Sequence, residues 1–397
     1  MYDAIIVGAR CAGSPTAMLL AQKGYKVLLV DKASFPSDTI STHIIWPPGV
    51  AHLKSWGLLE KVVATGCPRV NDLTFDVGSF ALHGSPTGYE GTTECYAPRR
   101  TILDKILVDA ARDAGAEVRE RCYVEGVVWD GGRVTGIRCR DDDGRTVTEK
   151  ARVVIGADGR NSAIARHVGA EKYNEKPDLA CWYYTYWSGV PVSGVEFYMA
   201  PEHAIGYLPT NDGQVCVPVA SKRSEFEKIR SDVEGYYWKA LEAAPTVAER
   251  LRSGRREEKF YGTGDVPNFF RKSHGPGWAL VGDAGYHKDP IGAQGISDAF
   301  REAELLAAAA DDGLSGTRPI DDALAAYAKT RDEEMIAMYE FNSQMAELEP
   351  PPAEMQLLMG ALRGNRAETD RFFGVIAGTV PVPEFFSPQN TMRIMAA

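Results

Sequence analysis

The chain contains 397 residues, of which 44% are hydrophobic and 25% are charged, and its formal net charge is −10. A chain of this length exceeds what one hydrophobic core usually supports, so we expect a globular protein of two linked domains. The negative charge argues against a broad nucleic-acid-binding surface, which needs a basic face.

Cysteine, histidine and hydropathy patterns narrow the class further. The seven cysteines are widely spaced, odd in number and without a C-x-x-C pair, which is typical of reduced thiols in a cytoplasmic protein. The histidines lack the spacing of a metal site, so no metal is expected. No apolar run reaches the roughly 18 residues of a membrane helix, so no membrane partner is expected. The state of assembly stays open between a monomer and a homodimer.

The first 30 residues predict a β-α-β unit. Strands are expected at 2–7 and 26–30, with a helix at 13–23 between them. Pro15 is tolerated in the first helical turn, and Gly24 stands where a C-terminal cap belongs. A unit of this length is typical of nucleotide-binding α/β proteins.

The turn Gly8-Ala9-Arg10-Cys11-Ala12-Gly13 is a variant of the G-x-G-x-x-G fingerprint. It keeps the first and last glycines and replaces the middle one with Arg10. The glycines allow a tight turn and close helix–strand packing, and the helix N-terminus offers N–H groups to a pyrophosphate. Asp31, which ends the second strand, can accept both hydroxyls of a ribose, and this favours FAD or NAD over NADP.

The next segments continue the first domain and leave it once. Residues 48–60 predict a short helix broken near Gly57, and 62–98 predict strands and loops outside the first domain. A helix with one apolar face is expected at 101–114, followed by a β-meander over 116–150.

A second glycine–acid turn begins a change of pattern. Gly156-Ala157-Asp158-Gly159-Arg160 follows an apolar strand that starts at residue 151. From about 174 to 270 the chain predicts a second domain, with an aromatic strand at 182–187 and one amphipathic helix near 223–242.

The third turn, Gly282-Asp283-Ala284, ends a strand that returns to the first domain. Helices are expected at about 294–310 and 320–347. The remaining residues predict one more helix and an apolar tail, which serve either as a lid over a pocket or as a packing or interface element.

Together, the three turns resemble those of the FAD-dependent aromatic hydroxylases, the para-hydroxybenzoate hydroxylase-like, single-component flavoprotein monooxygenases. The resemblance covers residues 1 to about 312. It implies an α/β fold in which a Rossmann-like FAD-binding domain is interleaved with an α+β substrate domain built on a β-sheet, followed by a C-terminal helical segment. The expected boundaries are 1–61, 99–173 and 271–345 for the FAD-binding domain, 62–98 and 174–270 for the substrate-binding domain, and 346–397 for the C-terminal helical or lid segment.

The resemblance also implies a reaction. FAD would be the cofactor and NADH or NADPH the reducing co-substrate. With O2, the enzyme would hydroxylate an aromatic or heteroaromatic small molecule through a flavin C4a-hydroperoxide, in secondary metabolism or aromatic catabolism.

The family's cofactor contacts map onto particular positions of this chain. The first turn would hold the pyrophosphate, and the third turn the ribityl chain. Arg100 is favoured over Arg99 as the arginine that contacts the cofactor. Asp158 is either a contact of FAD and the nicotinamide or a structural tie between the strand end and a neighbouring loop. The positions are Gly8, Ala12, Gly13, Asp31, Lys32, His43, Arg100, Val124, Asp158, Asp283, Gly295 and Ile296.

The segment 289–296 resembles the loop and helix start beneath the flavin ring, where backbone N–H groups would stabilise negative charge on the reduced ring. His43, Asp289 and Pro290 are the candidate catalytic residues, and Tyr286 and His287 are further side chains expected near the ring. His43 is a flavin contact, a general base for a phenolic substrate, or simply a hydrogen-bonding histidine.

The aromatic strand is expected to supply the substrate pocket. Successive side chains of a strand point to opposite faces, so Trp182, Tyr184 and Tyr186 share one face, and we expect them to meet the substrate. The alternative is that both faces of this strand only pack within the protein.

Three other functions are compatible with the motifs. Geranylgeranyl-reductase-type enzymes, which reduce double bonds, share the three turns and a strand like Gly206-Tyr207-Leu208-Pro209. Flavin-dependent halogenases share the cofactor fold, but their W-x-W-x-I-P segment and essential lysine are not recognisable here. An FAD-bound redox sensor or partner-binding module is a non-catalytic alternative, against which the aromatic second domain argues.

Overall fold

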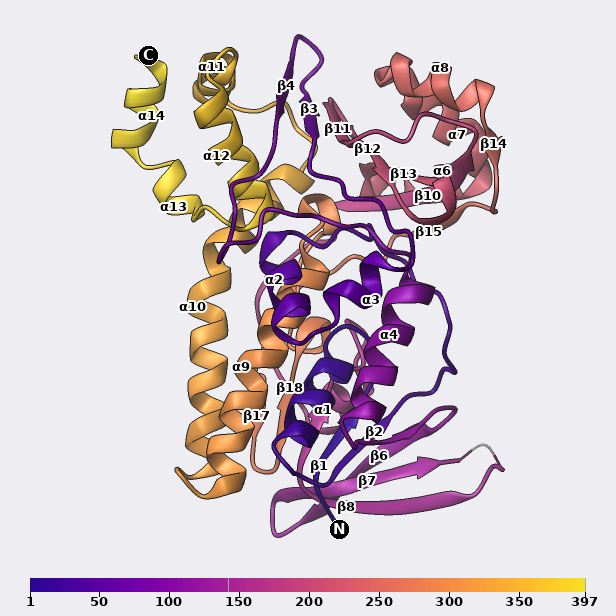
Figure 1. Cartoon of the computed structure of the whole chain (residues 1–397), viewed down its shortest axis with the longest axis vertical. Helices are drawn as coiled ribbons and strands as arrows, with labels where there is room; N and C mark the ends of the chain where they lie inside the picture. Colours follow the sequence, from indigo (N-terminus) through magenta and orange to yellow (C-terminus); the bar gives the residue numbers. More distant parts are fainter. Residues whose placement is uncertain (142, 397) are drawn as a thin grey trace.

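The computed structural model describes residues 1–141 and 143–396, whose strands form three sheets (Figure 1). One half of the molecule is built around the first sheet, near the N-terminus, and the other half around the second sheet (Figure 1). The expected α/β class is confirmed.

The first sheet has the strand order β17-β18-β8-β1-β2-β5, with a parallel centre. Its central strands are runs of Val, Ile, Leu and Ala because both faces are covered. β8 pairs antiparallel with β7 in its first half and parallel with β1 in its second. The strands are β1 (Tyr2–Val7), β2 (Val27–Val30), β5 (Glu117–Arg119), β6 (Tyr123–Asp130), β7 (Arg133–Arg140), β8 (Thr146–Gly156), β17 (His274–Gly275) and β18 (Trp278–Leu280).

The segment 116–150 is not one meander, as its pattern predicts. Its first strand, β5, pairs parallel with β2 and extends the main sheet, and only β6 to β8 form the meander. A three-residue strand is too short to show an alternating pattern. The preceding helix α4 (Arg100–Asp113) makes the crossover that brings the chain back parallel to β2.

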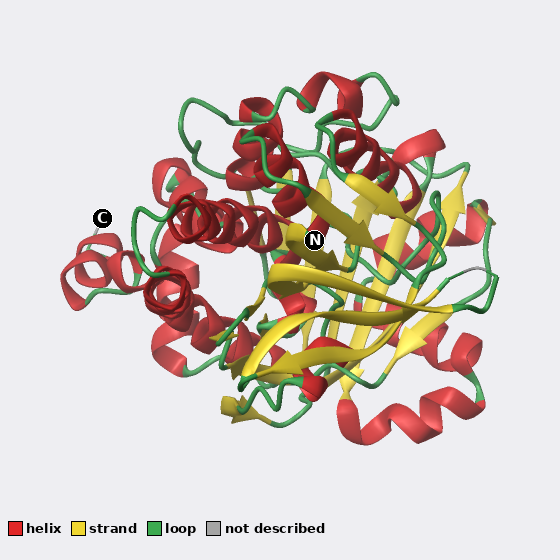
Figure 2. Ribbon diagram, turned by 90° about the horizontal axis from the view of Figure 1, so that it is seen from below, coloured by secondary structure: helices red, strands yellow, loops and turns green. Residues whose placement is uncertain are grey.

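Helices cover one face of the first sheet, and the meander covers the other. α1 (Gly13–Gln22) packs against α4 and α9 (Gly295–Ser315), and Ile6 of β1 belongs to the core that these helices share. Ile5, its neighbour in β1, packs on the opposite face with Ile137 of the meander. Seen from below, the strands run through the middle of the molecule with helices on either side (Figure 2).

The second sheet has the order β14-β10-β13-β12-β11-β3-β4, with β15 beside β10. β3 pairs parallel with β11, so an early segment of the chain completes a sheet that is otherwise made of later residues. The strands are β3 (Leu73–Asp76), β4 (Ala81–Gly84), β10 (Ala180–Ser188), β11 (Val195–Ala200), β12 (His203–Pro209), β13 (Val215–Lys222), β14 (Arg255–Arg256) and β15 (Tyr261–Thr263).

A third, small sheet and one long helix link the two halves. β9 (Lys172–Lys176), β16 (Asn268–Arg271) and β19 (Tyr286–His287) form the sheet. The helix α10 (Ile320–Ala346) runs along the molecule from the first half towards the second (Figure 1). The domain boundaries expected from the sequence stay a prediction.

The expected helix near 223–242 is interrupted. It consists of α6 (Phe226–Ser231) and α7 (Val233–Ala240), separated by Asp232 in a non-helical conformation. The Asp232 side chain accepts a hydrogen bond from Gly235 N–H and caps α7. An aspartate favours such a cap over a helix interior, and an amphipathic period does not reveal this break.

The C-terminal residues form four helices instead of one helix and a tail. Prolines precede or begin three of them, a position where the missing N–H costs nothing. The helices are α11 (Ala353–Leu362), α12 (Arg366–Ala377), α13 (Val382–Phe385) and α14 (Pro388–Met395).

The remaining helices are short and connect larger elements. The α-helices are α2 (Pro47–Ser55), α3 (Leu59–Val63), α5 (Ala163–His167) and α8 (Pro245–Ser253). The 3-10 turns are η1 (Asn211–Gly213), η2 (Arg223–Glu225), η3 (Leu241–Ala243), η4 (Gly282–Ala284) and η5 (Pro290–Gly292).

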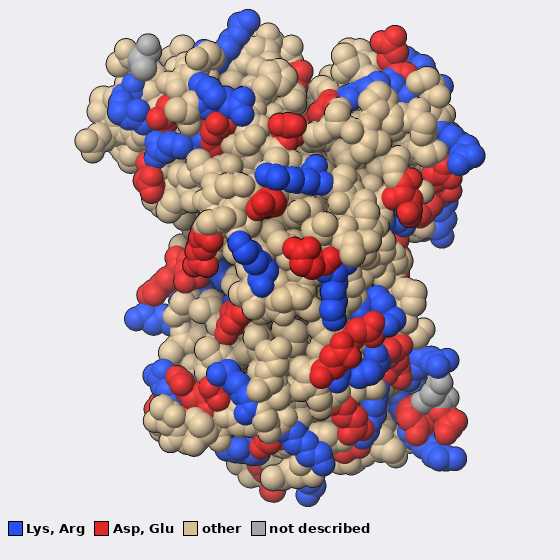
Figure 3. All heavy atoms as spheres, viewed as in Figure 1, with Lys and Arg blue, Asp and Glu red and all other residues tan. Residues whose placement is uncertain are grey.

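Two surface properties complete the description. Within residues 1–141 and 143–396, no helix is both long and apolar enough to span a membrane. Acidic and basic side chains are mixed over the face shown in Figure 3, so this face carries no single-sign patch.

Candidate active site

The three glycine–acid turns lie side by side at one edge of the first sheet. β18, β8 and β1 are neighbours, and parallel strands bring their carboxyl ends to the same edge. Ala157 N–H donates to Val7 O at 2.7 Å, and Val281 N–H donates to Gly156 O at 2.9 Å. The fold therefore assembles into one surface the turns that the sequence separates.

Close backbone packing explains the glycines of these turns. A Cβ on Gly13 would lie 1.8 Å from Gly8 O, and one on Gly8 would lie 2.3 Å from Ala157 O. Gly282, with φ +61°, would place a Cβ 2.8 Å from the Cβ of Ala12. The N-terminus of α1 opens onto this packed backbone, so the turns offer N–H groups without intervening side chains. This cradle fits the pyrophosphate of FAD.

Arg10, which replaces the middle glycine of the fingerprint, is held outside the turn. Its guanidinium donates to Ser37 O at 3.3 Å and to Ser37 Oγ at 3.0 Å, and it pairs with Asp104 of α4. The side chain therefore ties the first turn to the loop after β2 and to α4. Because these contacts hold the Arg10 side chain, the backbone of the turn remains available to a phosphate.

Asp31 and Arg100 flank the same turn. The two carboxylate oxygens of Asp31 accept from Ala9 N–H and Ala33 N–H, each at 2.7 Å, which fixes the acid at the end of β2. Arg100 Nε and Nη2 donate to Asp104 at 3.0 and 2.9 Å, so Nη1 is the guanidinium nitrogen that Asp104 does not bind. Both side chains are positioned beside the cradle by local contacts.

Asp158 serves its own loop. Its carboxylate accepts from Ala163 N–H at 2.7 Å, from Ile164 N–H at 3.2 Å and from the Ser162 hydroxyl. These contacts fix the start of α5 against the end of β8. The geometry favours the structural alternative for Asp158 over a contact with the nicotinamide.

Asp283 and Gly295 mark open space next to the third turn. They are the exposed residues in an otherwise buried or half-buried stretch from 278 to 300. A Cβ on Gly295 would meet no protein atom within 4 Å. The ribityl chain and ring of FAD fit this space, because an acid and a helix N-terminus border it.

We expect Gly295→Ala to weaken FAD binding without harming the apoprotein. The methyl group meets open space in the protein but would meet the cofactor, so the dissociation constant of FAD should rise about tenfold or more. The free energy of unfolding of the apoprotein should stay equal or rise by up to about 1 kcal/mol, because alanine favours a helix over glycine. FAD titration and thermal melting of the apoprotein measure the two quantities.

Gly360→Ala is the matched control, since Gly360 lies in α11 and its Cβ would also meet nothing within 4 Å. It should leave FAD affinity unchanged. Equal FAD affinity in Gly295→Ala and the unmodified protein would remove Gly295 from the cofactor site.

The η5 turn is fastened by side chains from three other parts of the chain. Asp289 N–H donates to Asn268 Oδ1 at 2.8 Å, and Asn342 Nδ2 donates to Asp289 O at 2.8 Å. Trp46 Nε1 donates to Gly292 O at 3.1 Å. The sequence analysis did not identify these three residues, because none belongs to a motif. Their only signal in the sequence is a polar group within an apolar segment.

The Asp289 carboxylate caps η5 from a fully buried position. It accepts from Ile291 N–H at 3.1 Å and from Trp182 Nε1 at 3.2 Å. Burial raises the pKa of Asp289 to about 7, although the two donors oppose the shift. Asp289 and Pro290 therefore shape the loop, and burial disfavours the charge of the Asp289 carboxylate.

Asp289→Asn should make stability less dependent on pH. The native pKa lies above the unfolded value of 3.8, so the native state loses stability as pH rises from about 4 to 7 and stays weakened above 7. An asparagine oxygen can accept from the same two donors without a charge to bury. The free energy of unfolding of the variant, relative to the unmodified protein, should rise by about 2–3 kcal/mol between pH 5 and pH 8. Urea titrations at both pH values measure it, and a difference that does not change with pH would contradict the assignment.

His43 and Tyr186 form a buried hydrogen-bonded pair, with His43 Nε2 2.7 Å from the Tyr186 oxygen. Burial, helped by Arg99 and Arg100, lowers the pKa of His43 to about 3, and burial raises the pKa of Tyr186. Both groups are therefore neutral at ordinary pH. His43 has a positive φ of 66°, and its Nδ1 is buried without a hydrogen-bond partner in the described part of the chain.

Arg99 supports this pair and not the cofactor cradle. Its guanidinium carbon lies 3.7 Å from the centre of the Tyr186 ring. The same group pairs with Glu258 at 2.7 Å and with Asp38 at 3.1 Å. Two carboxylates thus neutralise the arginine that covers the tyrosine.

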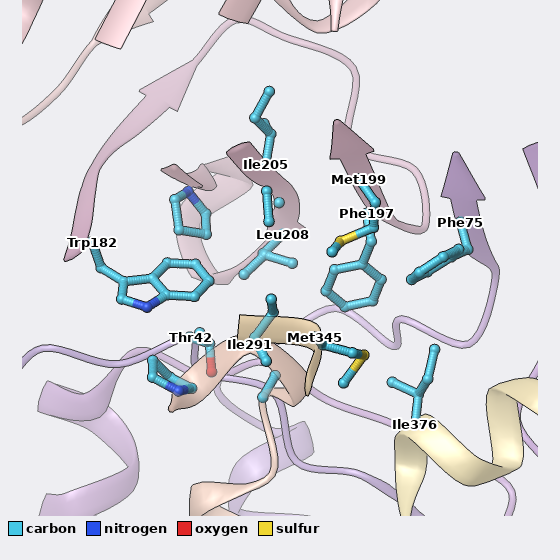
Figure 4. A pocket seen from close by; sticks show the side chains of 15 residues that line it. Thr42, Phe75, Trp182, Phe197, Met199, Ile205, Leu208, Ile291, Met345 and Ile376 are labelled. Carbon is cyan, nitrogen blue, oxygen red and sulfur yellow. The ribbon is translucent and has the colours of Figure 1, made fainter. Parts of the chain in front are cut away.

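An apolar pocket lies between the second sheet and η5 (Figure 4). Its empty space, including the part open to solvent, is about 510 Å³. Met345 of α10 and Ile376 of α12 form part of its wall, so the C-terminal helices contribute to the pocket. The lining residues are Thr42, Phe75, Trp182, Phe197, Met199, Ala204, Ile205, Gly206, Leu208, Pro218, Pro290, Ile291, Ala293, Met345 and Ile376.

The aromatic strand supplies one lining residue instead of three. Trp182 borders the pocket, whereas Tyr184 and Tyr186 do not line it. The ring of Tyr184 stacks on Tyr261 at 5.3 Å, and Tyr186 turns its hydroxyl to His43. Trp182 packs in one apolar cluster and Tyr184 and Tyr186 pack in another, so the later residues of β10 serve the core.

The other expected site residues have the following surroundings. Lys32 is exposed beside Asp31, Val124 is nearly buried in β6, and Ile296 packs in the core of α9. His287 hydrogen-bonds the carbonyl of Pro267, and Tyr286 packs in an aromatic core. Among the described residues, no group of three or more His, Cys, Asp or Glu side chains could hold a metal ion.

The packed turns, the acid at the end of β2 and the open space beside Asp283 define a nucleotide-binding flavoprotein. The family described as "FAD binding domain" matches residues 1–341, and the chain belongs to this family. The resemblance to the FAD-dependent hydroxylases is thereby confirmed at the level of the family, and FAD is the cofactor it binds.

Curated relatives carry out different reactions. Tryptophan 2-halogenase of Chondromyces crocatus is 27% identical over 79% of this chain, which spans only 61% of that protein's length. Digeranylgeranylglycerophospholipid reductase 2 of Methanothermobacter thermautotrophicus is 30% identical over 80% of each chain.

Solved structures share the fold. The myxobacterial chondrochloren halogenase CndH has a TM-score of 0.82 and 22% identity, with 99% of this chain and 95% of that chain covered. PqsL, a probable FAD-dependent monooxygenase from Pseudomonas aeruginosa, has a TM-score of 0.72 and 20% identity, with coverage of 94% and 99%. These likenesses establish the fold and leave the reaction to be argued from the site.

Proposed function

We propose that this protein is an FAD-dependent monooxygenase that uses NADH or NADPH and O2 to hydroxylate an aromatic or heteroaromatic small molecule. One oxygen atom enters the substrate, the other leaves as water, and the nicotinamide supplies the two electrons. The observation that carries the proposal is an aromatic-walled pocket directly against η5, the turn on which the flavin ring would lie.

Bound FAD, once reduced by the nicotinamide, would supply the activated oxygen. The residues of the chain would hold the cofactor, orient the substrate and shield the place of reaction from water. The Gly8–Gly13 turn would bind the pyrophosphate, Asp31 the ribose and Asp283 the ribityl chain. The N–H groups at the start of α9 would face the negative edge of the reduced ring. The apolar wall would exclude water from the place of oxygen transfer.

The His43–Tyr186 pair supports a hydroxylation of phenol-like substrates. His43 follows Thr42 of the pocket lining, and its buried Nδ1, which has no partner in the described part of the chain, can accept a hydrogen bond from a bound phenol or flavin without taking up the proton. Its Nε2 stays hydrogen-bonded to the Tyr186 hydroxyl, which fixes the orientation of the imidazole ring. Neither group needs to change its charge before a substrate binds.

Oxygen uptake with the yellow holoenzyme tests the proposal. NADH or NADPH is added with and without candidate phenols, and ¹⁸O2 is used to follow the oxygen atom. We expect substrate-stimulated O2 consumption and one labelled oxygen in the product. A flavin that neither nicotinamide reduces would favour the redox-sensor or partner-binding alternative.

A double-bond reductase is the second candidate, and two observations favour it. The reductase relative is 30% identical over most of both chains, and the apolar pocket would also accept a prenyl chain. A product that forms without O2 would support this function and overturn hydroxylation.

Halogenation receives less support from the pocket. None of the residues that line the pocket is a lysine. Lys288, two positions before the lining residue Pro290, is paired with Asp298. Adding chloride or bromide should therefore leave the mass of the product unchanged.

A further inference from the structure

The pocket offers almost no polar group to a ligand. Two of its side chains carry a nitrogen or oxygen atom, Thr42 and Trp182. The Trp182 N–H is already bound to the Asp289 carboxylate at 3.2 Å. The Thr42 hydroxyl is therefore the side-chain hydrogen-bonding group that the lining leaves for a ligand. Figure 4 shows the labelled apolar side chains converging on the same space.

Among the described residues that line the pocket, none carries a positive charge for an anionic ligand. Arg99 is occupied by Glu258, Asp38 and the ring of Tyr186, and it does not line the pocket. Lys288 is held by Asp298. Asp289, which accepts from the lining residue Trp182 and precedes the lining residue Pro290, would repel a carboxylate when it is ionised.

An ionised ligand would consequently lose its hydration without gaining a partner. Burial of an unpaired carboxylate or ammonium in an apolar site costs far more than burial of a neutral group of the same shape. A neutral aromatic ring, by contrast, gains contact with Trp182 and Phe197 in the wall. The difference is large enough to decide which substrates enter.

We propose that the substrate is an uncharged, largely hydrocarbon aromatic molecule, and that ligands bearing a carboxylate, phosphate or ammonium group are excluded. This inference rests on the proposed function in calling the ligand a substrate. The selection by charge is a property of the pocket and acts when a ligand binds, before any reaction. Thr42 would receive the one polar group, a hydroxyl or carbonyl. The chain thus takes free phenols or polycyclic phenols, not hydroxybenzoate-like acids.

A matched pair of probes tests the selection by charge. 6-Hydroxy-2-naphthoate and its methyl ester share ring and bulk but differ by one negative charge at pH 7.5. Their binding to the FAD-loaded enzyme is measured without nicotinamide, by the change in flavin absorbance and by calorimetry. We expect the ester to bind at least about 100-fold more tightly than the acid. Equal or tighter binding of the acid, or binding of neither probe, would overturn the proposal.

A variant pair locates the effect in this pocket. Met199 is half-buried on β11, so an arginine there can stay hydrated and the fold should survive. Met199→Arg should tighten binding of the acid at least about tenfold and weaken the ester, because it supplies the missing cation. Met199→Leu is the control and should keep the original preference. If the arginine variant folds, as judged by its melting curve, and the preference stays the same, the site of selection is elsewhere and the proposal fails.

The two proposals fail differently. If the pocket prefers the ester but the enzyme forms product without O2, the selection by charge is supported and hydroxylation is overturned. Labelled oxygen in a carboxylated product would do the reverse.

Discussion

Gly13→Val should yield a protein that cannot be loaded with FAD. Even the Cβ would lie 1.8 Å from Gly8 O and 3.0 Å from the Cβ of Ala157, and the first contact is with backbone that cannot swing away. α1 must shift away from β1, which removes its N-terminus from the pyrophosphate cradle. We expect bound FAD per protein to fall at least about tenfold, and stability to fall by about 3–5 kcal/mol.

The measurement is the flavin-to-protein ratio after reconstitution with excess FAD, together with a melting curve. Gly360→Ala again provides the control, because its Cβ meets nothing and alanine suits the interior of α11. A Gly13→Val protein with full FAD content would show that the first turn does not hold the pyrophosphate.

Tyr186→Phe should uncouple the reaction. Removal of the hydroxyl leaves His43 Nε2 buried without a partner, so the imidazole ring loses the hydrogen bond that fixes its tautomer and orientation. We expect product formation to slow about 100-fold while oxidation of the nicotinamide changes much less, with the balance released as hydrogen peroxide. His43→Ala should act in the same way, and the double variant should be little worse than either single one.

The ratio of product to nicotinamide consumed measures the effect. Tyr183→Phe also removes a tyrosine hydroxyl, but on the opposite face of β10, where the Tyr183 hydroxyl contacts the carbonyl of Phe226 at 3.4 Å. This control should remain coupled. Unchanged coupling in His43→Ala would take His43 out of the mechanism and leave it as a structural histidine.

The cofactor half of the site was predictable from the sequence because its geometry is local. Close approach of backbone requires glycine at positions 8 and 13, and a positive φ next to the Cβ of Ala12 requires it at position 282; each of these turns follows a short apolar strand. Asp31 was predictable for the same reason, since it ends the strand next to the first turn. Arg10 made the match to the glycine fingerprint weaker. Only its contacts with Ser37 and Asp104 explain how the turn accommodates this side chain.

The substrate half was not predictable in the same way. Trp46, Asn268 and Asn342 converge on η5 from three separate segments, and no pattern in the chain connects them. Tyr186 was expected to face the substrate, yet its partner is His43, which lies far away in the sequence. Side chains joined by long-range contacts leave no periodic or local signature.

The sequence by itself determined that this chain is an FAD-binding protein with three glycine turns after short apolar strands, because positive φ angles and close approaches restrict the residues allowed in such turns. Only the tertiary structure decided the character of the pocket. Its wall combines strands β3 and β10 to β13 with η5, α10 and α12, and none of its lining residues is charged, whereas Arg99 and Lys288 pair with acids outside the lining. Charge in a pocket depends on where long side chains find their partners, which is a property of the folded chain.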